Sequence, residues 1–315
     1  MENSKTVLRV KNASKKYNTT LAVDNISLAV KKGEILGMLG PNGAGKTSLI
    51  RMIMDIIAPD SGSIDFSLDD SIGSDSWQEK VGYLPEERGL YQQAKVKDIF
   101  SFLGGLKGMN KTEAQSAGKK WLQKFELESH FADKIEELSK GMAQKVQFIA
   151  SIIHDPELLI LDEPFSGLDP VSQDVMIEEI DSLARQGMAI MLSSHRMNLV
   201  EELCHNIFFI DHGQEVISGR LENIKENYGS YRVKLRTDEA TKMTEFVKNS
   251  AIITNHSREE GRWQLLLEDE AGPEDFMQLI SDQNIPVKEI SISRISLHDI
   301  FVRVARGGFL HEKIS

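Results

Sequence analysis

A glycine-rich run at residues 40–47 has the residue types and spacing of a triphosphate-binding loop. The run reads GPNGAGKT and matches the pattern GxxxxGK[ST]. Its glycines let backbone N–H groups surround an anionic phosphate, and a helix that begins here would present its positive dipole end to the same charge. Lys46 would neutralise the β and γ phosphates, and Thr47 would place its hydroxyl on Mg²⁺. The residues predicted to contact the nucleotide are Gly40, Pro41, Asn42, Gly43, Ala44, Gly45, Lys46, Thr47 and Ser48.

A pair of acidic residues follows an apolar run farther along the chain. Residues 158–161 read LLIL and lead directly into Asp162 and Glu163. Such a run predicts a buried strand, and ligands of open α/β sheets bind where the strands end. Asp162 fits a partner of Mg²⁺, directly or through water, and Glu163 fits a general base that polarises an attacking water. The glycine-rich loop alone leaves kinase, GTPase and ATPase chemistry open, and the acidic pair adds a candidate base for hydrolysis.

The elements that must position these residues follow an α/β pattern. Short apolar runs alternate with helical patterns over residues 1 to about 220, which is typical of helices layered on a largely parallel sheet. The apolar run 34–39 precedes the glycine-rich loop and a helical pattern at 48–57 follows it. Between about 95 and 155 the pattern is helical without interruption, which predicts a helical subdomain. The expected strands include 7–10, 35–39, 81–84, 158–161, 189–193 and 207–210.

The pattern changes near residue 230, which predicts a second, smaller domain. A strand at 231–237 is followed by a helix, two strands around the polar stretch 257–262, a second helix and a last strand at 287–294. This β-α-β-β-α-β order is typical of a split βαβ unit of the ferredoxin-like type. We therefore expect an α/β nucleotide-binding domain over 1–228 and a small C-terminal α+β domain over 229–315.

Taken in order across residues 10–215, these motifs resemble the ATP-binding cassette (ABC) ATPases. The run LSKGM at 138–142 resembles the family signature LSGGQ, with Lys140 in place of the first glycine and Met142 in place of the glutamine. The resemblance implies that Ser139 and Gly141 contact the γ-phosphate. The residues themselves allow a simpler role, because Ser139 can cap the helix predicted to run through Met142 and so leave free N–H groups toward an anion.

The resemblance also assigns four single residues. Asp169, in SGLDP, resembles the D-loop residue that lies across the dimer interface, and His195 matches the switch histidine that contacts the γ-phosphate. Tyr17 stands where the family stacks an aromatic ring on adenine, although a tyrosine of this kind can also be a plain strand-face residue. Glu86 replaces the glutamine that ligates Mg²⁺ and senses the transmembrane partner, and a carboxylate can still ligate the cation. The expected metal ligands are Thr47, Glu86 and Asp162.

The family resemblance implies a P-loop fold that takes ATP and Mg²⁺, with Glu163 and His195 as catalytic residues. It further implies a homodimer that packs head to tail, closes on ATP and powers export through separate integral membrane permease subunits. The run SLHDIFVRVARG at 296–307 resembles the appended domain of sodium and drug efflux ATPase subunits. The alternatives are a soluble cassette protein that clamps nucleic acid or ribosomes, and an ATP-sensing module without hydrolysis.

Composition narrows the class of protein. With 315 residues, 40% hydrophobic and 27% charged, the chain is unlike disordered, collagenous or disulfide-framework proteins. The formal charge of −11 argues against affinity for a phosphate backbone, so we expect no nucleic-acid partner. The lone Cys204 excludes an internal disulfide and fits a reducing compartment. The sequence contains no bilayer-length apolar run and no secretory signal pattern, so we expect a cytoplasmic chain, peripheral on the inner face of the cell membrane.

Overall fold

The computed structural model describes residues 5–68, 77–87, 89–228, 230–259, 261–268 and 271–305. They divide into two compact units, with the boundary between Gly219 and Arg220. The boundary predicted from the sequence lies between residues 228 and 229. It therefore assigns α7 (Leu221–Asn227) to the first unit instead of the second. Residue 229, part of the stretch 257–262 and the end of the run 296–307 lie outside the described residues.

The first unit contains the predicted sheet of buried strands. Its order is β5 (Val81–Leu84), β6 (Leu158–Asp162), β7 (Ala189–Ser194), β3 (Ile35–Leu39), β8 (Asn206–Asp211) and β9 (Gln214–Arg220). The pairs β5–β6, β6–β7, β7–β3 and β3–β8 are parallel. Every residue of β3, β6 and β7 is buried, which explains why these strands are apolar runs rather than alternating ones.

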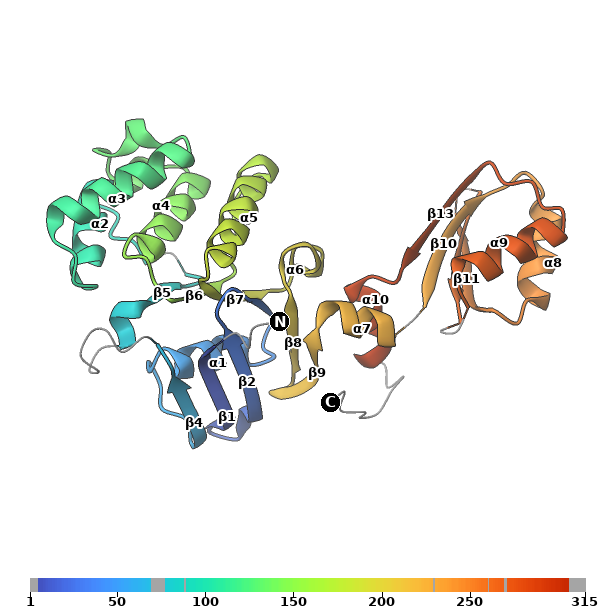
Figure 1. The fold of residues 1–315 in the computed structure, drawn as a ribbon, viewed down its shortest axis with the longest axis horizontal. Coiled ribbons are helices and arrows are strands. Elements are labelled where there is room, and N and C mark those ends of the chain that lie inside the picture. Colours follow the sequence, from blue (N-terminus) through green and yellow to red (C-terminus); the bar gives the residue numbers. More distant parts are fainter. Residues whose placement is uncertain are drawn as a thin grey trace. The chain divides into compact units, whose positions relative to one another are not determined.

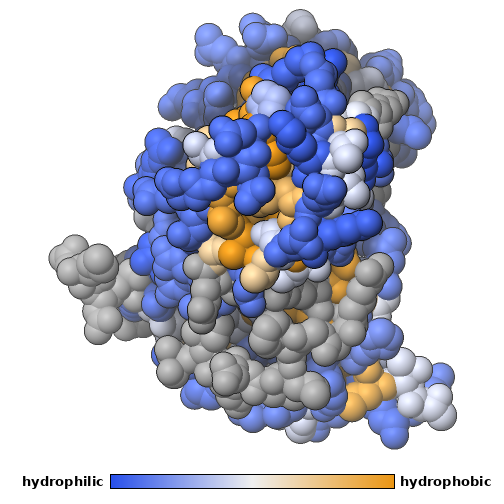
Figure 2. Space-filling model, turned by 90° about the vertical axis from the view of Figure 1, so that its right-hand side faces the viewer, coloured by the Kyte–Doolittle hydropathy of each residue, from blue (hydrophilic) through white to orange (hydrophobic). Residues whose placement is uncertain are grey.

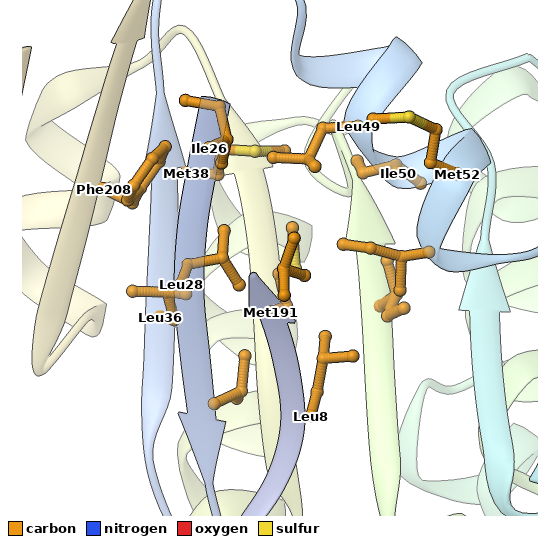
Figure 3. Close-up of a cluster of buried hydrophobic side chains, with 14 of the residues drawn as sticks. Leu8, Ile26, Leu28, Leu36, Met38, Leu49, Ile50, Met52, Met191 and Phe208 are labelled. Atoms are coloured by element: carbon orange, nitrogen blue, oxygen red, sulfur yellow. The ribbon is translucent and has the colours of Figure 1, made fainter. Parts of the chain in front are cut away.

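A second, antiparallel sheet packs against the first within this unit. It consists of β2 (Thr20–Lys31), β1 (Thr6–Tyr17) and β4 (Ser61–Phe66), and the predicted strand 7–10 lies in it. The core between the two sheets and α1 (Lys46–Ile53) includes Leu8, Ile26, Met38, Leu49 and Met191 (Figure 3). This sheet was not predicted, because irregularities in the β1–β2 register interrupt the period-two pattern that identifies a half-buried strand.

The helical subdomain is confirmed as a block of three helices, α2 (Val96–Gly105), α3 (Lys111–Lys124) and α4 (Lys140–Ile152), which gather together in Figure 1. Lys107 connects this block to the sheet, because its Nζ donates to the carbonyl of Val81 at 2.9 Å and to that of Gln78. The described part of the first unit also contains α5 (Pro170–Arg185) and α6 (Met197–Leu203). It has 3₁₀ turns at Trp77–Lys80, Glu128–His130 and Ile135–Glu137.

The second unit has the expected β-α-β-β-α-β order. Its elements are β10 (Tyr231–Arg236), α8 (Ala240–Asn249), β11 (Ile253–Glu259), β12 (Arg262–Leu267), α9 (Pro273–Asp282) and β13 (Glu289–Arg294). The strands form one antiparallel sheet in the order β11-β12-β10-β13. Its core contains Trp263, Phe246 and Phe276. The ferredoxin-like assignment itself stays a prediction.

A last helix, α10 (Leu297–Ala305), begins at the sequence run SLHD. Ser296 and Asp299 form its reciprocal cap, because each backbone N–H donates to the other's side chain, at 3.1 and 3.2 Å. Asp299 also accepts from Arg232 of β10 at 2.6 Å, which attaches α10 to the sheet.

Figure 2 shows a largely hydrophilic face that carries a strip of hydrophobic side chains. Within the described residues, no helix has both the length and the apolar character to cross a bilayer.

Candidate functional site

The carboxyl ends of parallel strands bring the predicted site residues to one edge of the sheet. Because β3, β5, β6 and β7 run in the same direction, the segments that follow them emerge together. The glycine-rich loop follows β3, Glu86 follows β5, Asp162 ends β6 and His195 follows β7. A cavity of about 280 Å³ at this edge is lined by Ala22, Asn42, Gly43, Gly45, Lys46, Thr47, Ser48, Glu86, Asp162 and Glu163.

The conformation of the glycine-rich loop requires glycine at Gly45, the residue before α1. Its φ is +111°, and a Cβ added there would lie 2.2 Å from the carbonyl oxygen of Ala22. Of the predicted loop residues, Gly40, Pro41 and Ala44 do not line the cavity. Gly40 and Pro41 instead accept hydrogen bonds from Lys46, and Ala44 is only 3% exposed. The loop therefore lines the cavity with Asn42, Gly43 and residues 45–48, and not with its first two residues.

The ammonium group of Lys46 is held at the mouth of the loop. Its Nζ donates to the carbonyl of Gly40 at 2.7 Å and to that of Pro41 at 3.1 Å. Burial lowers the pKa of Lys46, whereas the charges of Glu163, Asp162 and Glu86 raise it. These carboxylates stabilise the ammonium form, so a fixed cation stands where the loop can receive phosphate oxygens.

Asp162 is a buried carboxylate with one oxygen engaged and one free. It pairs with Ser193 in the β6–β7 register, and the Ser193 hydroxyl donates to its Oδ1. Its Oδ2 is buried without a hydrogen-bond partner among the described residues. Burial raises the pKa of Asp162, and the hydrogen bond from Ser193 opposes this rise. A buried carboxylate oxygen without a donor is the atom that a bound cation would satisfy.

The residues at this edge fit a magnesium ion. The Asp162 Oδ2, the Thr47 hydroxyl and the Glu86 carboxylate all belong to residues that line the cavity, and all are the hard oxygen donors that Mg²⁺ prefers. No three His, Cys, Asp or Glu side chains converge into a metal site of their own in the described part of the chain. This suits Mg²⁺, which is usually held by one or two carboxylates and completes its shell with water and substrate phosphate.

Glu163, which lines the cavity, forms a hydrogen-bonded pair with His195, which does not line it. The Glu163 Oε1 accepts from the backbone N–H of His195 at 2.9 Å and lies 2.7 Å from the imidazole Nδ1. Since an ionised carboxylate only accepts, Nδ1 carries the hydrogen in this arrangement. The Glu163 side chain is 12% exposed and its φ is +51°, a left-handed conformation uncommon for a non-glycine residue. The pair is thus a carboxylate that His195 holds through one oxygen, on a residue that lines the cavity.

The signature and D-loop residues lie together on a surface outside the cavity. We call Ser139, Lys140, Gly141 and Gly167 the signature surface. The Ser139 hydroxyl caps α4 by accepting from the Met142 N–H at 3.2 Å, as predicted. A Cβ on Gly141 would lie 3.4 Å from the carbonyl oxygen of Gly167, so the two runs are in contact. None of these residues lines the cavity within the same chain.

The other assigned residues occupy the following places. Asp169 caps α5, because its carboxylate accepts hydrogen bonds from the Ser172 N–H at 3.0 Å and from the Ser172 hydroxyl at 2.6 Å. The hydrogen bond from the hydroxyl is the main cause of the lowered pKa of Asp169. Tyr17 ends β1, is 41% exposed and does not line the cavity. Glu86 lines the cavity and is exposed.

Three residues at the site were not predicted from the sequence. Ser193 and Ser194 support the two acidic residues, the Ser194 hydroxyl lying 3.5 Å from the Glu163 Oε2. Ala22 comes from the unpredicted strand β2 and lines the cavity. The available signal was the pair of serines at the end of the apolar strand before His195. Their partners depend on the β6–β7 register, which the sequence pattern does not determine.

Comparisons with protein families match both units. The family profile described as "ABC transporter" matches residues 23–166, and the one described as "ATP-binding protein DrrA1-3-like, C-terminal domain" matches residues 219–305. Among curated proteins, the chain is 37% identical over 305 residues to "Uncharacterized ABC transporter ATP-binding protein YhaQ" of Bacillus subtilis, covering 94% of this chain and 97% of that protein.

Two relatives have names that mention a process. One is the "Linearmycin resistance ATP-binding protein LnrL" of Bacillus subtilis, 36% identical and covering 71% of this chain and 72% of that protein. The other is the "Nod factor export ATP-binding protein I" of Burkholderia pseudomallei, 33% identical and covering 71% and 77%. A solved structure, "Structure of ATP binding subunit of ABC transporter", is 28% identical with a TM-score of 0.65 and covers 71% of this chain and 94% of its own.

Proposed function

The chain belongs to the ATP-binding proteins of ABC transporters, a family of ATPases, and on that premise we propose that it hydrolyses ATP to drive export through separate membrane subunits. The observation that carries this proposal is the convergence of Lys46, Asp162 and Glu163 on one cavity at the sheet edge. A held cation, a free buried carboxylate oxygen and a second, oriented carboxylate are the groups that phosphoryl transfer to water requires.

The reaction follows from the positions of these side chains. The loop N–H groups and Lys46 would bind the β and γ phosphates. Glu163 would accept a proton from water while the water oxygen attacks the γ-phosphorus, and the bond to the β–γ bridging oxygen breaks to release ADP and phosphate. His195 holds the Glu163 Oε1 in place. We also propose that His195 is a catalytic residue that contacts the γ-phosphate. Thr47, Asp162 and Glu86 would hold Mg²⁺, which supplies charge neutralisation of the phosphates when bound.

We further propose that two copies complete each site. The cavity of about 280 Å³ lies at the lower end of the roughly 300–1,000 Å³ range of small-molecule pockets. The signature surface, with the capped N-terminus of α4, lies outside it. In a two-fold, head-to-tail dimer, Ser139 and Gly141 of one copy would close over the ATP bound by the other. ATP would then favour the closed dimer, and hydrolysis would favour opening.

The closure of such a dimer would act on permease subunits at the inner face of the membrane, where we place this chain as a peripheral cytoplasmic protein. The names of two relatives, which mention Nod factor export and linearmycin resistance, support export as the direction. We propose drugs or sodium ions as the class of cargo.

The proposal is tested first by phosphate release and ATP binding of the purified chain. Lys46→Ala is expected to weaken ATP binding by at least about tenfold, because it removes the cation held at the loop. Lys111→Ala, which removes an exposed lysine from α3, serves as the control and is expected to bind as the parent. Unchanged ATP binding by Lys46→Ala would contradict the assignment of the site.

Coupling to export needs a second experiment. The chain would be co-expressed with a multi-span membrane protein encoded beside it, and the purified complex would be reconstituted in vesicles. ATP-dependent movement of cargo that Glu163→Gln abolishes would support the transport role. A chain that hydrolyses ATP but neither binds the membrane protein nor moves cargo would contradict that role and leave only the ATPase assignment.

A further inference from the structure

The nucleotide cavity carries more negative than positive charge. Among its lining residues, Glu86, Asp162 and Glu163 are acidic and only Lys46 is basic. A triphosphate adds further negative charge, and one Mg²⁺ would offset only part of the total. A complete site therefore calls for an additional cation, and the described lining residues do not provide one.

Glu86 is the carboxylate in this cavity that such a cation can reach, because Mg²⁺ needs only one of its two oxygens and the other stays available. Asp162 is 1% exposed and accepts from Ser193, and Glu163 is 12% exposed and bonded to His195. Glu86 is exposed, and none of the ion pairs among the described residues involves it. Its carboxylate can accept an ion pair from a neighbouring molecule without breaking a contact in its own chain.

Lys140 is an exposed cation in an unfavourable place. It is the first residue of α4, directly after the cap Ser139, and the first turn of this helix contains no acidic residue. A positive charge at a helix N-terminus opposes the helix dipole. None of the ion pairs among the described residues involves Lys140. Lys140 can therefore meet an anion of another chain without losing an ion pair in its own, and such a contact would also offset the unfavourable dipole.

We propose that in the ATP-bound dimer Lys140 of each copy forms an ion pair with Glu86 of the other, beside the γ-phosphate. This inference depends on the proposed function, which places the signature surface of one copy over the cavity of the other. The two residues depart together from the family pattern, a glutamate in place of glutamine and a lysine in place of glycine. Each departure alone would unbalance the site, and across the interface they neutralise each other.

A charge-reversal experiment tests the pairing in trans. Glu86→Lys and Lys140→Glu would be made separately in the Glu163→Gln background, and the dimer Kd with ATP would be measured by fluorescence energy transfer between labelled chains. Each homodimer would place like charges together, so its Kd is expected to rise by at least about tenfold. In a mixture of the two variants, both interfaces of the heterodimer hold opposite charges, and the Kd is expected to return to within about threefold of the parent.

The matched control is Lys111→Glu. Lys111 is the first residue of α3 and follows a side-chain cap, Asn110, as Lys140 follows Ser139. Its reversal is expected to leave the dimer Kd unchanged. The salt dependence provides a second readout, because the effect of each reversal is expected to shrink as ionic strength rises.

The outcomes separate the pairing from the proposed function. A Glu163→Gln parent that binds ATP but stays monomeric would refute the composite-site proposal itself. A parent that dimerises, with reversal variants that dimerise equally well or a mixture that is not restored, would overturn the pairing alone. If Glu86→Lys no longer binds ATP, the double-mutant cycle of Glu86→Gln and Lys140→Met decides. If the dimer Kd of the double variant differs from the value expected by combining the two single changes, the pair is supported. If the two single changes simply combine, the pair is overturned.

Discussion

Replacing Glu163 by glutamine should separate ATP binding from hydrolysis. Glutamine has the same size and keeps a carbonyl oxygen that can accept from the His195 N–H, now 2.9 Å from the Glu163 Oε1. It cannot accept a proton from water, and the loss of a general base typically costs about 10²- to 10⁴-fold in rate. This corresponds to roughly 2.7–5.5 kcal/mol in the barrier to phosphate release.

ATP binding should survive the same substitution, because the cavity loses one of its three carboxylates and keeps Lys46. Single-turnover phosphate release and binding of a fluorescent ATP analogue would measure the two quantities on one preparation. Glu222→Gln makes the same change of charge at a side chain that is 79% exposed on α7, and it should alter neither quantity. Phosphate release within about threefold of the parent would refute the role of Glu163 as the base. A loss of ATP binding as large as the loss of phosphate release would also refute the role of Glu163 as the base.

Three further substitutions test the geometry. Gly45→Ala should weaken ATP binding by at least about tenfold in a fluorescence titration, because its Cβ would lie 2.2 Å from the Ala22 carbonyl oxygen; parental affinity would contradict this. Burial raises the pKa of Asp162, so the stability this group contributes is present below its unfolded pKa and is lost as pH rises through the folded pKa. Asp162→Asn should therefore raise the Tm of the nucleotide-free chain at pH 7, with little change near pH 3, and an unchanged or lower Tm at pH 7 would contradict it. Lys107→Met should lower the free energy of unfolding by about 1–3 kcal/mol in urea titrations, because two backbone carbonyls lose their donor, and an unaltered midpoint would show that this contact contributes nothing.

The sequence predicted those parts of the fold that depend on local pattern. The apolar runs that became β3, β6 and β7 are buried throughout, so their composition alone identified them. The helical block and the β-α-β-β-α-β order of the second unit followed from periodicity in the same way. The antiparallel sheet did not, because the β1–β2 register is irregular and local patterning carries no information about which strands pair.

The same division applies to the site. The glycine-rich loop and the Asp162–Glu163 pair were predictable because their chemistry lies in residues adjacent in the chain. The supporting serines and Ala22 were not, since they reach the cavity through β6–β7 pairing and through β2. Whether Tyr17, Ser139 and Asp169 contact nucleotide stays a prediction, since these residues lie outside the cavity of a single chain.

The mass of the Glu163→Gln chain with and without ATP tests the central claim most directly. Sedimentation equilibrium should give 35.4 kDa for the chain without nucleotide and with ADP. With ATP and Mg²⁺ the mass should double, and Ser139→Arg in the same background should prevent the doubling. A chain that binds ATP tightly yet remains at 35.4 kDa would contradict the account, because each nucleotide would then occupy a site that one copy completes alone.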